Sequence, residues 1–391
     1  MSGSGWDCPG GTCDWLDGEQ SPSEGGREME ASPPSTASFP APGGAEDGGS
    51  WQGLVLDDNV DGSAYLSYLR GLDPEVSRYR LAAWDGPLHT FRVANSAGAP
   101  VLGATIEITG PNGGVVATRV SHADGRAEWG APEASGPFTV RVRKDLASVE
   151  QQIDPTQPRT DITLDALTGA EAPKVDVLFL IDATASMADV LTRVSADVAT
   201  IEAGVRALPG APTVRYGLTV FRDREESFLT RTFNFTANSG TFVQALGEVR
   251  ATGGGDTPEA LDAGLRDALV KPAWGGGGTI KLVVVIGDAP PHADGGSAPN
   301  ALEVGLESAN TQGVSIIGIA APGADGAAVA TFRQMARRTR GSFVGLAGPG
   351  AGQSRSDPAF GATANAASGE PLPVASILVA QIGERLAALQ G

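Results

Sequence analysis

The sequence is poor in cysteine and histidine, and both shortages exclude whole classes of site. The 391 residues include two cysteines and three histidines. Because Cys8 and Cys13 both lie in the first, polar segment, no disulfide framework is expected to hold the folded parts together. His89, His122 and His292 have no cysteine near them, so the sequence predicts no zinc cluster.

Positive charge is also scarce. There are 28 Lys and Arg against 46 Asp and Glu, which gives a net charge of -18. Proteins that bind nucleic acid need dense positive charge to neutralise the phosphate backbone, so nucleic acid is not an expected partner. An acidic surface of this kind suits cations or basic partners better.

Long hydrophobic runs are missing as well. No run approaches the roughly 18 apolar residues that a membrane-spanning helix needs, so no membrane span is expected. The first residues, MSGSGWDCPG, have neither the charged nor the apolar region of a signal peptide. The sequence as written therefore predicts an unexported protein, whereas a start further upstream would fit a secreted or cell-surface one, so the compartment stays open.

Composition and periodicity divide the chain into six segments. The first is rich in Gly, Ser, Pro and acids and has few aliphatic residues, which is typical of a disordered tail. The predicted segments are a tail (1–50), a short helical or irregular lead-in (51–87), a β-sandwich (88–167), an α/β domain (174–346), a flexible loop (347–372) and a final helix (373–391).

The lead-in contains a pattern that matches the opening of a calcium-binding loop. Asp57, Asn59, Asp61 and Gly62 are spaced as D-x-N-x-D-G. The twelfth position of such a loop should be a bidentate Glu, and here it is Tyr68. The favoured interpretation is a capped turn before a short helix.

Residues 88–167 alternate apolar and polar side chains with period two. The stretch PFTVRVRK is the clearest case, and the turn sequences NSAG, PNGG and ADG recur at short intervals. About seven short strands in an antiparallel sandwich are predicted. The stretch GAPVLGATIEITGPNGG resembles the carboxypeptidase-regulatory family of Ig-like sandwiches, which implies a module that positions a neighbour.

Residues 174–346 change to alternating strands and helices. VDVLFLID (175–182) and KLVVVIGD (281–288) are continuous apolar runs that end in an acid, as buried parallel strands do. The alternation predicts a doubly wound, mostly parallel, Rossmann-like α/β sheet. Apolar residues with helical spacing are clearest in two stretches. The first contains Met187, Val190, Leu191, Val194, Val198, Ile201, Val205 and Leu208. The second is expected to form a helix that packs back on the sheet, and it contains Ile377, Leu378, Ile382, Leu386 and Leu389.

Oxygen-bearing side chains follow the two acid-ending strands. Asp182, Thr184 and Ser186 alternate along one loop, and Asp288 ends the other strand. In a doubly wound sheet, ligands collect beyond the carboxyl ends of the strands. One or two carboxylates with hydroxyls make a hard, weakly charged donor set, which predicts Mg²⁺ or Mn²⁺.

A third loop, GGGDTPEAL (253–261), leads into a helix. Its glycines would suit a phosphate loop, but no lysine follows them. A purely structural interpretation is that Asp256 or Thr257 caps the helix and Pro258 occupies its first position.

Together these three loops resemble the metal-ion-dependent adhesion site (MIDAS) of a von Willebrand factor A (vWA) domain, and YGLTVFRD between them is similar to the hemicentin-like and bacterial members. The resemblance implies Asp182, Thr184, Ser186 and Asp288 as metal ligands, with Thr184 in place of the usual Ser. For the second loop it leaves Thr257 and Glu259 as alternatives, with Asp256 in the outer shell.

The leading functional hypothesis is a cation-dependent protein-binding or adhesion module and not an enzyme. A partner's Asp or Glu would complete the coordination of the ion. Ser186 has no evident base, and His292 is expected at the rim of the site. The alternatives are a haloacid-dehalogenase-like phosphohydrolase with Asp182 as nucleophile, whose second acid is missing because position 184 is Thr, and a structural module with a vestigial site.

Overall fold

The computed structural model describes nine stretches of the chain: 15–17, 52–81, 88–130, 136–166, 172–224, 226–254, 257–293, 301–347 and 372–390. The predicted tail, apart from 15–17, and almost all of the predicted loop at 347–372 lie outside these residues. So do Cys8, Cys13 and Asp256.

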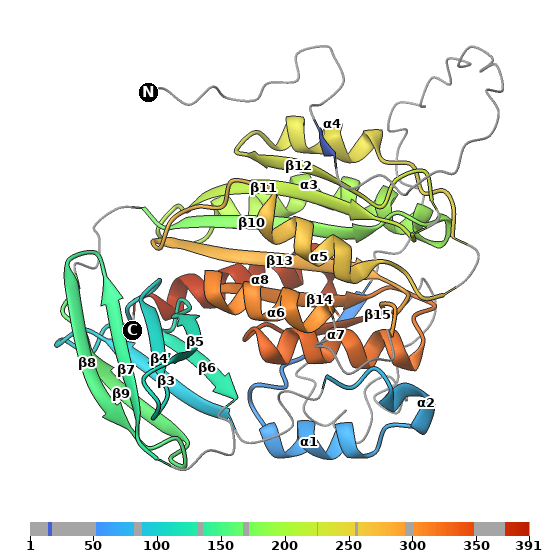
Figure 1. The fold of residues 1–391 in the computed structure, drawn as a ribbon. Helices are drawn as coiled ribbons and strands as arrows, with labels where there is room; N and C mark the ends of the chain where they lie inside the picture. Colours follow the sequence, from blue (N-terminus) through green and yellow to red (C-terminus); the bar gives the residue numbers. More distant parts are fainter. Residues whose placement is uncertain are drawn as a thin grey trace, which may run out of the picture.

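One large sheet forms the centre of the molecule (Figure 1). Its order is β1-β12-β11-β10-β13-β14-β15-β2-β16, and the five strands from β11 to β15 in this order run parallel. The predicted doubly wound, mostly parallel sheet is therefore confirmed. The strands are β1 (Trp15–Asp17), β2 (Gln52–Leu56), β10 (Lys174–Asp182), β11 (Thr213–Phe221), β12 (Thr230–Thr236), β13 (Thr279–Gly287), β14 (Val314–Ala320), β15 (Phe343–Ala347) and β16 (Leu372–Pro373).

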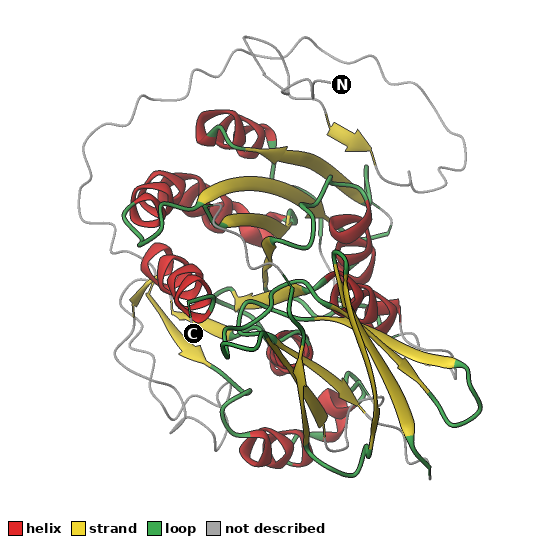
Figure 2. Cartoon of the chain, turned by 90° about the vertical axis from the view of Figure 1, so that its left-hand side faces the viewer, coloured by secondary structure: helices red, strands yellow, loops and turns green. Residues whose placement is uncertain are grey.

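Helices cover both faces of this sheet (Figure 2). One hydrophobic core lies under α3 (Ala188–Arg206), α4 (Ser239–Glu248) and α8 (Val374–Ala388). The other lies under α5 (Leu261–Val270), α6 (Ala301–Gln312) and α7 (Gly326–Arg338). The final helix packs back as predicted, through Ile377, Leu378, Ile382, Leu386 and the partly buried Leu389. None of the described helices is long and apolar enough to cross a bilayer.

Two pieces of the N-terminal part join the large sheet, which the sequence did not predict. In the lead-in, expected to be helical or irregular, β2 pairs antiparallel with β15. Trp15–Asp17 pairs antiparallel with β12. The apolar QGLVL stretch of β2 contributes Leu54 and Leu56 to one of the two cores. Burial of these two side chains favours the pairing of β2 with the large sheet.

The rest of the lead-in is held by its acidic residues. Asp61 accepts hydrogen bonds from the backbone N–H groups of Ser63 and Ala64, and so caps α1 (Gly62–Arg70). Asp57 accepts from the backbone and side chain of Asn59. The predicted capped turn is confirmed. A second short helix, α2 (Pro74–Ser77), follows.

Residues between Leu88 and Thr163 form seven strands in two smaller sheets. β6, β3 and β9 make one sheet, β5, β4, β7 and β8 make the other, and both contribute to a single hydrophobic core. β3 and β9 run parallel, so the arrangement is not purely antiparallel as predicted. The family of this unit stays a prediction. The strands are β3 (Leu88–Ala94), β4 (Thr105–Thr109), β5 (Val115–Val120), β6 (Arg126–Gly130), β7 (Phe138–Lys144), β8 (Ala147–Ile153) and β9 (Arg159–Thr163).

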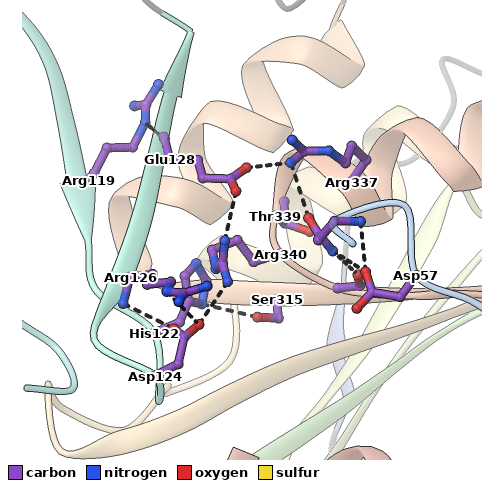
Figure 3. A network of polar contacts seen from close by, with 12 residues as sticks. Asp57, Arg119, His122, Asp124, Arg126, Glu128, Ser315, Arg337, Thr339 and Arg340 are labelled. Atoms are coloured by element: carbon purple, nitrogen blue, oxygen red, sulfur yellow. Dashed lines mark hydrogen bonds and ion pairs between the residues drawn. The ribbon is translucent and has the colours of Figure 1, made fainter. Parts of the chain in front are cut away.

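A seam of ion pairs joins this seven-stranded unit to α6 and to the end of α7, and a hydrogen bond joins it to β14. Figure 3 shows the part of the seam around Glu128. Glu128 of β6 pairs with Arg337 and Arg340, and the Arg340–Glu128 distance is 2.7 Å. Arg340 also pairs with Asp124 at 2.8 Å. The buried side chain of His122 meets Ser315 on β14, with 3.1 Å between Nδ1 and Oγ. Glu128 is buried, and its partners Arg337 and Arg340 are half-buried, so these contacts join the two units away from bulk solvent.

Candidate functional site

The first loop of the site begins at the last residue of β10. Asp182 is 1% exposed, and its Oδ1 accepts hydrogen bonds from the backbone N–H and the hydroxyl of Thr184, at 2.8 and 2.7 Å. The hydroxyls of Thr184 and Ser186 lie 3.3 Å apart. The three predicted first-loop residues therefore form one cluster, in which Asp182 and Thr184 are buried and Ser186 is exposed.

Backbone contacts bring the second loop against the first. Ala185 N–H donates to the carbonyl of Gly253, and Thr252 N–H donates to the carbonyl of Ala183, each at 3.1 Å. A β-carbon on Gly254 would lie 3.0 Å from Thr184 Cβ and 3.5 Å from Glu259 Oε1. Gly254 thus brings the backbone close to both side chains, and its φ of +70° is a conformation that glycine adopts without strain.

The third loop closes the group. Asp288, half-buried, follows Gly287, where a β-carbon would lie 3.8 Å from Asp182 Oδ2. Glu259 N–H donates to the carbonyl of Pro290 at 3.0 Å, which ties the second loop to the third. The carboxyl ends of β10 and β13 and the loop before α5 therefore meet at one edge of the sheet, as ligand sites in doubly wound folds do.

The electrostatics of Asp182 are unusual for a carboxylate. Burial raises its pKa to about 6, the negative charge of Asp288 adds to this, and the hydrogen bonds from Thr184 act in the opposite direction. Its Oδ2 is buried and accepts no hydrogen bond from the described residues. A buried, ionised carboxylate oxygen with no partner lowers the stability of the folded protein unless a cation or a hydrogen-bond donor contacts it.

The two alternatives for the second loop are placed differently. Glu259 is 3% exposed and lies beside the first loop, whereas Thr257 is exposed. The capping interpretation of this loop is wrong. α5 begins at Leu261 with Ala260 as its N-cap and no side-chain cap, because the chain at Glu259 runs extended beside Pro291 of the third loop.

Three residues around the site were not predicted from the sequence. Arg222, at the end of β11, donates to the carbonyls of Ala183 and Arg250, at 3.3 and 2.6 Å, and so supports the first loop. Glu226 Oε1 accepts from Gly254 N–H at 2.8 Å. Asp223 Oδ1 lies 2.5 Å from Nε2 of His292. The FRD sequence after β11 was the available signal for Arg222 and Asp223.

The donor set at this edge fits a hard divalent cation that keeps water ligands. Among the described residues, no three His, Cys, Asp or Glu side chains come together in a group that could hold a metal by themselves. A site here would depend on hydroxyl oxygens and water beside its carboxylates, which suits Mg²⁺ or Mn²⁺ and not zinc. The unsatisfied Oδ2 of Asp182 is the atom that such an ion would satisfy.

Comparison with known proteins matches this part of the chain to one family. Residues 176–295 match the family model described as von Willebrand factor A domain. The alpha-protein kinase vwkA of Dictyostelium discoideum is 28% identical over 144 residues, which are 37% of this chain and 22% of that protein. The chain thus spans about a fifth of the length of this relative.

Solved structures overlap the chain only loosely. The conserved hypothetical protein BatB from Bacteroides thetaiotaomicron has 14% identity and a TM-score of 0.36, and the overlap covers 55% of this chain and 99% of that one. The pilus adhesin SpaC from Lactobacillus rhamnosus GG has 12% identity and a TM-score of 0.30, covering 49% and 27%. Proximal thread matrix protein 1 from mussel byssus has 18% identity and a TM-score of 0.28, covering 38% and 36%.

The family match, and not these low-scoring overlaps, agrees with the order of the three loops and with the doubly wound sheet. The matched residues include β10 from Asp176 onward, the second loop, and the third loop as far as the described residues extend. This match supports a von Willebrand factor A domain over residues 176–295.

Proposed function

We propose that the vWA domain is a divalent-cation-dependent protein-binding module. Mg²⁺ or Mn²⁺ is held by Asp182, Thr184, Ser186 and Asp288, with one residue of the second loop. The bound ion supplies an electrophilic position that an Asp or Glu of a partner protein occupies. Domains of this family are commonly protein-interaction or adhesion modules, in line with this role.

The observation that carries the proposal is the carboxylate of Asp182. One of its oxygens is saturated by Thr184, and the other is buried with no hydrogen-bond partner among the described residues. Mg²⁺ and Mn²⁺ keep water ligands in protein sites, so an ion bound to this oxygen has positions that a ligand from outside the chain can take. The partner's carboxylate replaces one of these waters.

For the second loop, we propose Glu259 as the ligand. Its side chain is buried beside Thr184, and Thr257 faces solvent. Both are within the same loop, so their roles can be separated by substitution. Asp256, proposed for the outer shell, lies outside the described residues.

We also propose that the site is not catalytic. A haloacid-dehalogenase-like mechanism needs a second acid two residues after Asp182, and Thr184 occupies that position. The Thr184 hydroxyl donates to Asp182 Oδ1, so it supports the carboxylate and supplies no acid or base.

The test uses an array of peptides, each with a single Glu, matched to the same peptides with Gln. The full chain should bind a subset of the Glu peptides in Mg²⁺ and release them in chelator, because only a carboxylate completes the coordination. Asp182→Ala should abolish this binding. The control is Asp161→Ala, which removes an exposed carboxylate from β9. Equal capture of Glu and Gln peptides, or capture that survives chelator and Asp182→Ala, contradicts the proposal.

A further inference from the structure

The outer edge of β12 is paired with a short strand from a distant part of the chain. Trp15–Asp17 runs antiparallel to β12, with Trp15 opposite Phe233 and Asp17 opposite Arg231. It is the short dark blue strand beside α4 in Figure 1. β11 pairs with the other side of β12. The edge of a sheet presents backbone N–H and C=O groups to which an extended segment can add as a further strand, and Trp15–Asp17 does this here.

The indole of Trp15 anchors this strand between β12 and the end of α4. Its ring centroid lies 6.2 Å from that of Phe233, and its Nε1 donates to Oε2 of Glu248, the last residue of α4, at 3.0 Å. Trp15 is half-buried and packs against the hydrophobic core under α4. A tryptophan that is packed on its ring and hydrogen-bonded at its nitrogen is typical of the anchor residues of peptide interfaces.

The two positions after the tryptophan also have defined surroundings. Leu16 is half-buried, and the alternation of side chains along a strand places it on the face opposite to Trp15. Arg231 is exposed and is in register with Asp17. Since residues directly opposite each other in an antiparallel pair interact, Arg231 favours an acid at this position of a bound segment. The β12 edge thus fits an extended segment with a tryptophan, an aliphatic residue and an acid in succession.

The strand that occupies the β12 edge is short. It has three residues, and it pairs with three of the seven residues of β12. Few backbone hydrogen bonds can form over this length, so little besides the Trp15 anchor holds the strand. A segment that pairs along more of β12 can replace it, because backbone hydrogen bonds supply much of the affinity when a strand is added to a sheet.

The chain is long enough for this strand to leave β12 while the rest of the sheet stays intact. Residues 18–51 connect it to β2, which is seven strands away in the order of the sheet, or about 34 Å at the usual spacing of strands. A stretch of this length can reach about 110 Å at most. Pairing of β2 with β15 therefore does not oblige Trp15 to remain at the β12 edge.

We propose that the β12 edge is a docking site for an extended segment of a partner protein, and that Trp15–Asp17 is an intramolecular competitor for it. The partner's segment carries a tryptophan, an aliphatic residue and an acid, and adds to β12 as a strand. Its indole takes the place of Trp15 beside Phe233, and Glu248 accepts the indole N–H. The site uses none of the residues of the proposed metal site, so the two proposals stand or fall separately.

The test is fluorescence anisotropy of a labelled peptide with the sequence of residues 11–20 and Cys13→Ser, titrated with the full chain in EDTA. Trp15→Ala removes the anchor of the competitor, so this variant should bind the peptide saturably. The wild-type chain should bind it at least tenfold more weakly, because a tethered segment competes at an effective concentration of about 1 mM. A peptide that also carries Trp15→Ala should lose its binding. EDTA prevents the acids of the peptide from binding through a metal ion.

Further substitutions locate the binding. In the Trp15→Ala chain, Glu248→Ala should weaken peptide binding by about fivefold, because it removes the acceptor of the indole N–H. Asp161→Ala, an exposed acid on β9, is the matched control and should leave peptide binding unchanged. Trp6→Ala in the wild-type chain controls for loss of a tryptophan, and should bind the peptide as weakly as wild type.

Four results would overturn the proposal. They are no saturable binding of millimolar peptide by the Trp15→Ala chain, equal binding by this chain and wild type, equal binding of the peptides with and without tryptophan, and no effect of Glu248→Ala.

Discussion

Asp182 combines burial, a neighbouring negative charge and an oxygen with no partner among the described residues. Without a cation, this combination makes the ionised side chain a source of instability in the folded state. With a cation, the same features favour tight binding, because the ion satisfies the free oxygen and offsets the charge of Asp288. We therefore propose that Asp182 serves ligand binding more than the stability of the fold.

The first prediction is that Asp182→Asn stabilises the metal-free chain at neutral pH. The folded-state pKa of about 6 lies above the unfolded value of 3.8, so the stability linked to the protonated form is present below about pH 4 and is lost as the pH rises through 6. In chelator, the variant should therefore raise the free energy of unfolding by about 2 kcal/mol at pH 7.5. Urea denaturation at pH 7.5 and pH 4 measures this. If Asp182→Asn lowered the free energy of unfolding by the same amount at pH 7.5 and at pH 4, the prediction would be contradicted.

Among the residues around the candidate site, those that lie next to a recognisable strand were predicted from the sequence, and those without such a local pattern were missed. Asp182, Thr184, Ser186 and Asp288 were predicted as site residues because each lies at or just after the end of a buried apolar strand. Glu226 was missed, because its contact with Gly254 joins two loops and leaves no periodic pattern in either.

Among the elements, α7 and the lead-in are joined by a buried ion pair. Arg333 on α7 is fully buried, and its Nε and Nη2 donate to Oδ2 and Oδ1 of Asp58, at 3.0 and 2.7 Å. Its guanidinium also lies 3.5 Å from the ring centroid of Tyr68 on α1. The pKa of Asp58 is raised despite this partner, because burial disfavours its charged form.

Removing one member of this pair should be strongly destabilising. Asp58→Ala removes a carboxylate that accepts two hydrogen bonds from the buried guanidinium of Arg333, and should lower the free energy of unfolding by about 3 to 5 kcal/mol. Urea denaturation measures the loss. Asp161→Ala, which removes an exposed partner of Arg159, is the matched control and should leave the midpoint almost unchanged. Equal effects of the two substitutions would show that the buried pair has no special structural role.

The elements themselves were largely predictable, and their distant partners were not. Alternating apolar runs and amphipathic spacing identified β10, α3, β13 and α8. The pairing of β2 with β15 joins segments at opposite ends of the chain, and local periodicity carries no information about such pairs. The start of α5 was misplaced for a similar reason, since a contact with the third loop holds Glu259 extended.

On the scale of the whole molecule, the structure places two distinct features at opposite ends of one sheet. The three loops of the proposed metal site lie at the carboxyl ends of the parallel strands, and a cavity lined by the first residues of β10, β11 and β13 lies at their amino ends. The seven-stranded unit closes the cavity and is fixed by the seam of Arg337, Arg340 and Glu128. Nothing in the local sequence predicted this seam, because its partners come from units that were recognised separately.

The central claim is that the three loops bind a divalent cation, and calorimetric titration of the full chain with Mn²⁺ tests it most directly. The account predicts uptake of about one ion per chain that is abolished by Asp182→Ala and unchanged by Asp161→Ala. Glu259→Gln should weaken binding by about tenfold or more, whereas Thr257→Val should have little effect, because Glu259 is the buried residue of the two. No uptake of Mn²⁺, or uptake that Asp182→Ala leaves unchanged, would contradict the account.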